Sequence, residues 1–249
     1  MPAATMTRIP LVLVPGLMCN HAVWEPLDPW LQKDRDCTVA DHGHADALTE
    51  MAERLLQEAP SQMVLAGHSM GARVVLEAVR LAPQRIRGVA LLDTGYLPRP
   101  AGDAGLEEER KRMALLQVAR EQGVRAMAHA WVQGMVHPSR LADAPLIERI
   151  VAMFSEKSAA VFENQIRALL SRPDGTAVLR ALTVPTLVLC GRQDSWSPVA
   201  QHQAMQALVP EASLAVIEDA GHMAPMEQPQ AVAQAMLQWL ARCDQAQEI

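Results

Sequence analysis

One serine in this chain stands between two glycines, where a short apolar run gives way to a helical pattern. The apolar run 63–66 is bounded on both sides, as is typical of a buried parallel strand. From 70 to 82 the apolar side chains repeat with a period near 3.6, and a proline then stops the pattern. Ser69 is therefore predicted to occupy a tight, strained turn between a strand and a helix. Such a turn needs residues without bulk two positions on either side, and these are Gly67 and Gly71.

This pentapeptide, Gly-His-Ser-Met-Gly, is typical of a turn that presents a nucleophilic serine. A serine hydroxyl needs a neutral imidazole to accept its proton, and the imidazole needs a carboxylate to orient it. Two later loops supply these groups in the expected chain order, Asp194 first and His222 second, with Gly221 permitting the turn before the histidine. The strand-like runs that precede these loops are 186–190 and 213–217. We predict Ser69 as nucleophile, His222 as base and Asp194 as the orienting acid.

The oxyanion formed during attack on a carbonyl needs two hydrogen-bond donors. The residue after the nucleophile, Met70, is expected to provide one backbone amide. The second is expected in the loop after the early strand 9–14, and Leu17 is our candidate.

These four segments together resemble the α/β-hydrolase superfamily over nearly the whole chain. The resemblance implies a mostly parallel central sheet flanked by helices, an inserted helical cap and no cofactor. Within the superfamily the chain looks like small esterases, enol-lactonases and carbon–carbon bond hydrolases. It has Pro15 and Gly16 where many members carry His-Gly, so the support of the oxyanion loop is altered. His68 and Met223 replace the asparagine and tryptophan that many carbon–carbon hydrolases show, which disfavours that reaction.

Strand-like and helical patterns alternate along the chain except in one region. The further strand-like runs are 37–40 and 87–92, and helical patterns cover 22–30 and 49–58. Between 98 and 182 the patterns are helical only, at 107–122, 124–136, 145–154 and 159–170. We therefore expect a hydrolase core made of 1–97 and 183–249, with 98–182 inserted as a cap. Such a cap closes a pocket and sets substrate shape.

Five side chains are candidates for contact with the substrate. Four lie in the expected cap and one lies in the loop of the acid: Trp131, Met135, His137, Phe154 and Trp196. For the four in the cap, packing between helices is the alternative interpretation.

Two rival assignments concern other acidic and histidine residues. Asp93, at the end of strand 87–92, occupies the acid position used by a minority of the superfamily. The segment Asp41 to Ala47 contains a His-x-His-x-Asp pattern of the kind that begins a binuclear zinc site in other hydrolases. The histidine that ends that motif is replaced by Ala47, so we predict no metal.

Composition agrees with one enzyme domain that acts on a small molecule. The 249 residues carry a net charge of −6 with no long run of either sign, which disfavours nucleic acid and anionic membranes as partners. No targeting segment or membrane helix is recognisable, so we expect a cytoplasmic protein. The cysteines are expected to be free thiols, at positions 19, 37, 190 and 243. The sequence does not specify the oligomeric state.

The sequence thus predicts a serine hydrolase of a small carboxylic ester or lactone, with an acyl-enzyme intermediate on Ser69. Two alternatives stay open. One is a carbon–carbon bond hydrolase of a diketone-type substrate with the same three residues, and the other is a non-catalytic ligand-binding protein on the same fold.

Overall fold

A single parallel sheet organises the molecule. The computed structural model describes residues 8–246, and its six strands lie in the order β2-β1-β3-β4-β5-β6, with every neighbouring pair parallel. The strands are β1 (Leu11–Val14), β2 (Cys37–Val39), β3 (Met63–His68), β4 (Ile86–Leu92), β5 (Thr186–Gly191) and β6 (Ser213–Ile217). The central strands are buried on both faces, which explains why their sequences are continuously apolar rather than alternating.

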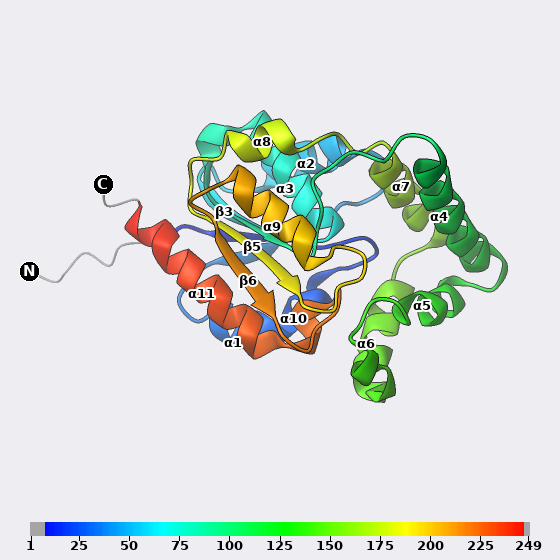
Figure 1. Ribbon diagram of the computed structural model, residues 1–249. Coiled ribbons are helices and arrows are strands. Elements are labelled where there is room, and N and C mark those ends of the chain that lie inside the picture. The colour runs from blue at the N-terminus through cyan, green and yellow to red at the C-terminus, as the bar shows by residue number, and fades with distance from the viewer. Residues whose placement is uncertain (1–7, 247–249) are drawn as a thin grey trace, which may run out of the picture.

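Helices cover both faces of this sheet (Figure 1). One face carries α1 (Asp28–Leu31) and the long α11 (Pro229–Gln245), whose Trp239 is buried against the strands. The other face carries α2 (Leu48–Glu58), α3 (Met70–Leu81) and α9 (Val199–Leu208), with the short α8 (Thr176–Arg180) beside them. The short α10 (Ala224–Glu227) leads into α11. The sheet is thus the middle of three layers, as predicted.

The chain leaves the sheet after β4 and returns to it at β5, a strand that pairs directly with β4. Between them lie α4 (Asp103–Glu121), α5 (Val124–Val132), α6 (Ala144–Ser155) and α7 (Ala159–Leu170). Figure 1 shows these four helices gathered beyond the end of the sheet to which the strand arrows point. They therefore lie over the carboxyl ends of the strands, where the loops with Ser69, Asp194 and His222 are also found.

Some predicted elements differ from the observed ones. The expected helix 22–30 is instead a series of short turns, two 3₁₀ turns followed by α1, because prolines at 26 and 29 interrupt a regular backbone ladder. The helix expected over 124–136 ends at Val132, where the chain turns to place Met135. Among the described residues, no helix is both long enough and apolar enough to cross a membrane.

Candidate active site

The turn at Ser69 is strained and closely packed. Ser69 has φ 54°, a conformation rare for residues other than glycine, and it sits between the end of β3 and the start of α3. Its backbone is fixed from two sides, since its N–H donates to Leu92 O at 2.8 Å and its carbonyl accepts from the Thr94 hydroxyl at 2.8 Å. A Cβ at Gly71 would lie 2.1 Å from Val14 O. The glycine therefore allows α3 to start against β1.

Three side chains remote in the sequence form one hydrogen-bonded chain at this turn. His222 Nε2 lies 2.8 Å from Ser69 Oγ, and His222 Nδ1 lies 2.8 Å from Asp194 Oδ2. Both distances are within the range required for proton transfer from a hydroxyl to an imidazole that a carboxylate orients. The structure therefore brings together the three residues that were predicted to act together.

Asp194 is held in the ionised form needed for this arrangement. Burial alone would raise the pKa of the carboxyl group, but the His222 ring and the backbone N–H groups of Ser197 and Trp196 outweigh it and lower the pKa. Both of those N–H groups donate to Oδ1 at 2.9 Å. Asp194 Oδ2 therefore accepts its hydrogen bond from the imidazole of His222.

Asp93, the rival acid, occupies a different position. It is buried, and its Oδ1 accepts a hydrogen bond from Gly191 N at 2.9 Å, whereas its Oδ2 is 3.8 Å from His68 Nε2. His68 in turn donates through Nε2 to the carbonyl oxygen of His222 at 2.8 Å. Burial, followed by the charge of Asp194, raises the pKa of Asp93 well above its ordinary value. Asp194, and not Asp93, therefore contacts the imidazole.

The loop that carries His222 depends on a buried carboxyl group. Glu227 Oε1 accepts from the backbone N–H of Gly221 at 2.9 Å and of Met223 at 3.2 Å, on either side of the histidine. Gly221 itself does not have a positive φ, so the expectation that it forms the tight turn was wrong; Asp219 does, with φ 53°. Gly221 is needed for close approach instead, because a Cβ there would lie 2.6 Å from Met135 O.

Two backbone amides line the space next to Ser69. Leu17 and Met70 both border the cavity, and within residues 8–246 neither of their N–H groups donates a hydrogen bond. The loop of Leu17 is anchored at the next residue, where Met18 (φ 61°) donates through its N–H to Oε1 of the buried Gln165 at 2.8 Å. A second anchor is His42, whose Nε2 donates to Pro15 O at 2.8 Å.

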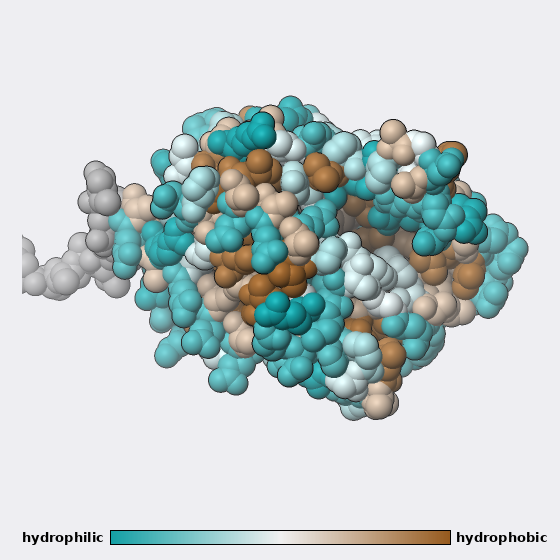
Figure 2. All heavy atoms as spheres, viewed as in Figure 1, coloured by the Kyte–Doolittle hydropathy of each residue, from teal (hydrophilic) through white to brown (hydrophobic). Residues whose placement is uncertain are grey.

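A cavity of about 510 Å³ lies between the carboxyl ends of the strands and helices α4–α7. In the space-filling view the surface is hollowed between these two parts, with hydrophobic atoms visible in the hollow (Figure 2). Four of the five candidate contact residues line it, namely Trp131, Met135, Phe154 and Trp196. The ring of Trp131 stacks on that of Trp196 with centroids 5.6 Å apart, so α5 and the Asp194 loop contribute to one aromatic wall.

His137 is not among the residues that line the cavity, so the prediction for it is corrected. Its ring Nδ1 accepts from the N–H of Ser139 at 3.1 Å and caps the 3₁₀ turn that follows. Its own backbone N–H donates to Glu227 Oε2 at 2.7 Å. The His137 side chain therefore stabilises the local turn.

The side chains of the His-x-His-x-Asp pattern do not come together at one site. His42 faces Pro15 O, whereas His44 and Asp46 are exposed. Across residues 8–246 there is no group of three or more histidine, cysteine, aspartate or glutamate side chains placed to hold a metal ion.

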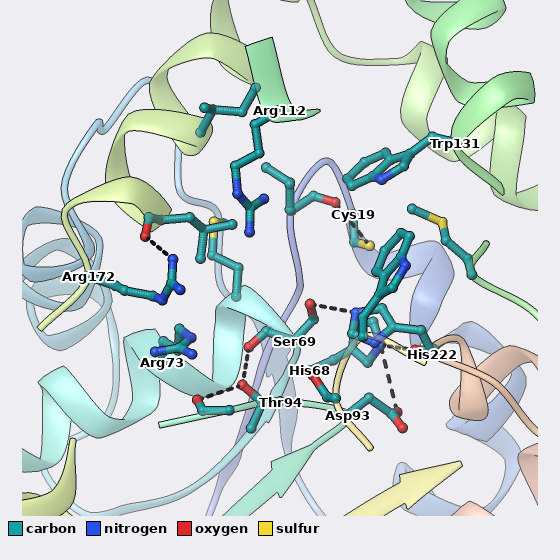
Figure 3. Close-up of a pocket in the computed structure, with 18 of the residues that line it drawn as sticks. Cys19, His68, Ser69, Arg73, Asp93, Thr94, Arg112, Trp131, Arg172 and His222 are labelled. Carbon is teal, nitrogen blue, oxygen red and sulfur yellow. Dashed lines mark hydrogen bonds and ion pairs between the residues drawn. The ribbon is translucent and has the colours of Figure 1, made fainter. Parts of the chain in front are cut away.

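Sequence reasoning missed three arginines that line the same cavity: Arg73, Arg112 and Arg172. Arg73 could have been found, because it lies in the first turn of the helix that starts directly after Ser69. The other two approach from α4 and from the chain just after α7, and no local pattern places them there. Figure 3 shows all three on one side of Ser69, with Trp131 and His222 on the other.

The chain belongs to the alpha/beta hydrolase fold family, whose model matches residues 9–229. A pimeloyl-[acyl-carrier protein] methyl ester esterase of Photobacterium profundum is 27% identical over 237 residues, which cover 91% of this chain and 92% of the relative. Among solved structures, a thermophilic esterase from Thermogutta terrifontis with malate bound is 28% identical, with a TM-score of 0.84 over 96% of this chain and 91% of that one. The enol-lactonase from Burkholderia xenovorans LB400, 18% identical, shares the fold with a TM-score of 0.79 over 96% and 94%.

Fold, site and relatives together define the class of the protein. It is a hydrolase that acts on ester bonds.

Proposed function

We propose that this protein is a serine hydrolase that cleaves a small carboxylic ester or lactone through an acyl-enzyme on Ser69. The observation that carries the proposal is the continuous chain Ser69 Oγ to His222 Nε2 and His222 Nδ1 to Asp194 Oδ2, with both distances 2.8 Å. The relatives support it, because they include a methyl ester esterase, an esterase solved with the small carboxylic acid malate, and an enol-lactonase.

In the first half of the reaction, Ser69 Oγ attacks the substrate carbonyl and His222 Nε2 accepts the hydroxyl proton. Asp194 stabilises the resulting imidazolium, while the amides of Leu17 and Met70 donate to the oxyanion. Each such donor contributes about 3 to 4 kcal/mol to lowering the barrier. The tetrahedral intermediate collapses as His222 returns the proton to the departing alcohol oxygen.

In the second half, water replaces the alcohol. His222 takes a proton from this water as its oxygen attacks the acyl-enzyme, and the collapse of the second intermediate returns the proton to Ser69 Oγ. The acid is then released, and the enzyme is regenerated.

Residues 98–182 are proposed to act as a cap over this site. Trp131, Met135 and Phe154 from the cap, with Trp196 from the acid loop, form the aromatic and apolar wall against which the substrate would pack. A water-poor cavity strengthens the electrostatic interactions that stabilise the oxyanion.

A fluorophosphonate probe tests the nucleophile. The wild-type protein should be labelled at one site per chain, and Ser69→Ala should not be labelled. Equal labelling of both proteins would refute the assignment.

Short p-nitrophenyl esters separate the enzyme from the ligand-binding alternative. An absence of turnover across all chain lengths, together with tight binding of a ligand, would favour a binding protein.

A further inference from the structure

The cavity next to Ser69 has one strongly cationic wall. The guanidinium groups of Arg73, Arg112 and Arg172 come from three separate segments and border the same cavity as the serine (Figure 3). Arg172 has a side chain only 9% exposed, and that of Arg112 is 25% exposed. They are therefore not a solvated surface cluster.

A single carboxylate partly neutralises this wall. Glu108 forms a two-pronged pair with Arg172, whose two terminal nitrogens lie 2.7 and 2.8 Å from its two oxygens. Arg112 contacts the same carboxylate at 2.9 Å. Lys111 also borders the cavity but is exposed and pairs with Glu107 on its own helix. Two guanidinium groups thus share the one negative charge.

Arg73 is left without a counter-ion. In the part of the chain that the structure describes it forms no ion pair, and its hydrogen bond is to the carbonyl oxygen of Leu97 at 3.0 Å. Burial, and then the positive charge of Arg172, lower the pKa of Arg73 to about 9. It still carries its charge at neutral pH, although a partly buried cation beside two like charges is unfavourable unless an anion joins it.

The position of Arg73 relative to Ser69 indicates which molecule would carry that anion. Ser69 directly precedes α3, Arg73 lies in the first turn of that helix, and both residues border the same cavity. A group held by Arg73 can therefore belong to the same small molecule whose carbonyl lies at Ser69. The planar fork of a guanidinium matches a carboxylate, and Glu108 shows that this cluster already holds one in that manner.

We infer that the substrate is an acidic ester or lactone, one that carries a free carboxylate bound by Arg73 with Arg112 and Arg172 beside it. This inference rests on the proposed function, because it names the substrate class of that same site. The uncharged remainder of the substrate lies against the aromatic wall on the opposite side of Ser69.

The test compares pairs of methyl esters that differ only in a terminal carboxylate. Monomethyl succinate, glutarate and adipate are matched with methyl butanoate, pentanoate and hexanoate, and kcat/KM is measured for each with the wild type and with Arg73→Gln. We expect the wild type to favour the acidic member, and Arg73→Gln to reduce the ratio of acidic to neutral kcat/KM about 10- to 100-fold, mainly through KM of the acidic ester. Arg110→Gln is the matched control, since Arg110 is on α4, 72% exposed and paired with Glu107. It should keep the wild-type ratio.

Two further readouts separate this inference from the proposed function. If Ser69 is labelled by the fluorophosphonate but the wild type shows no preference for acidic esters, or Arg73→Gln keeps the wild-type ratio, the inference is overturned and the hydrolase proposal stands. Thermal melting with and without glutarate measures the anion site without turnover. Glutarate should raise Tm of the wild type and of Arg110→Gln, and should raise it much less for Arg73→Gln; equal shifts in all three would also overturn the inference.

Discussion

At the scale of single residues, the carboxyl pKa values of two buried aspartates are shifted in opposite directions. Asp194 accepts hydrogen bonds from two backbone N–H groups and from His222, and its pKa is lowered. Asp93 is fully buried with one such bond, and its pKa is raised. The same residue type therefore has a carboxyl pKa below its ordinary value at one position and well above it at the other.

This difference predicts a ranking of two conservative variants. Asp194→Asn removes the charge that stabilises the imidazolium and favours the wrong tautomer of His222, so kcat should fall about 1,000- to 10,000-fold. Asp93→Asn keeps an oxygen that accepts from Gly191 N–H, and residue 93 does not hydrogen-bond to the His222 ring, so the loss should be far smaller. Steady-state kinetics with one p-nitrophenyl ester measures both. The reverse ranking would transfer the role of the acid to Asp93.

At the scale of elements, short helices and loops hold the site through a few buried polar side chains. Glu227 on α10 accepts from backbone N–H groups on both sides of His222 and from that of His137 in the helical segment. Gln165 on α7 similarly holds the loop that carries Leu17. The positions of the His222 loop and of the Leu17 loop thus depend on buried side chains outside the predicted catalytic residues.

Glu227→Ala should show the cost of losing such a contact. Three N–H groups, two of them buried, would lose their acceptor, so we expect the free energy of unfolding to fall by about 2 to 4 kcal/mol, with a lower kcat because the His222 loop loosens. Urea denaturation and ester turnover measure the two effects. Glu218→Ala is the control: its side chain is 64% exposed and pairs only with Arg192, so its effect should stay below about 1 kcal/mol. Similar losses in both variants would argue against this role of Glu227.

Local patterns predicted the strands and the three side chains that meet at Ser69, for physical reasons. Buried parallel strands such as 186–191 are continuous apolar runs, and the turn at Ser69 demands small neighbours, so both leave a signature in the sequence. The arginines of the cavity and the acceptor Gln165 leave no such signature, because their contacts form only when segments distant in the sequence meet. His137 was misassigned for a different reason: its ring accepts from the N–H of Ser139, only two residues on, and it does not line the cavity.

At the scale of the whole molecule, the cysteines are dispersed and buried. All four are free, as the sequence predicted. Burial raises the pKa of Cys19, Cys190 and Cys243 to about 12 and that of the half-buried Cys37 to about 11. Only a small fraction of each is therefore thiolate at pH 8.

The native protein should accordingly react slowly with an aromatic disulfide reagent at pH 8. The four thiols should titrate rapidly only in denaturant, and Cys37 should be the first to react without it. Mass spectrometry of the partly modified protein identifies the site. Two or more thiols modified at once in the native protein would contradict the burial described above.

The direct pairing of β4 with β5 has an evolutionary consequence. Because the strands on either side of the inserted helices are neighbours, the whole insertion can be exchanged for another of different length without disturbing strand registry. A replacement must also keep the contacts that the insertion makes with the site, among them acceptors for the N–H groups of Met18 and His222 and a donor for Glu227. Substrate selectivity can thus be changed by engineering the insertion while the sheet and its loops are retained.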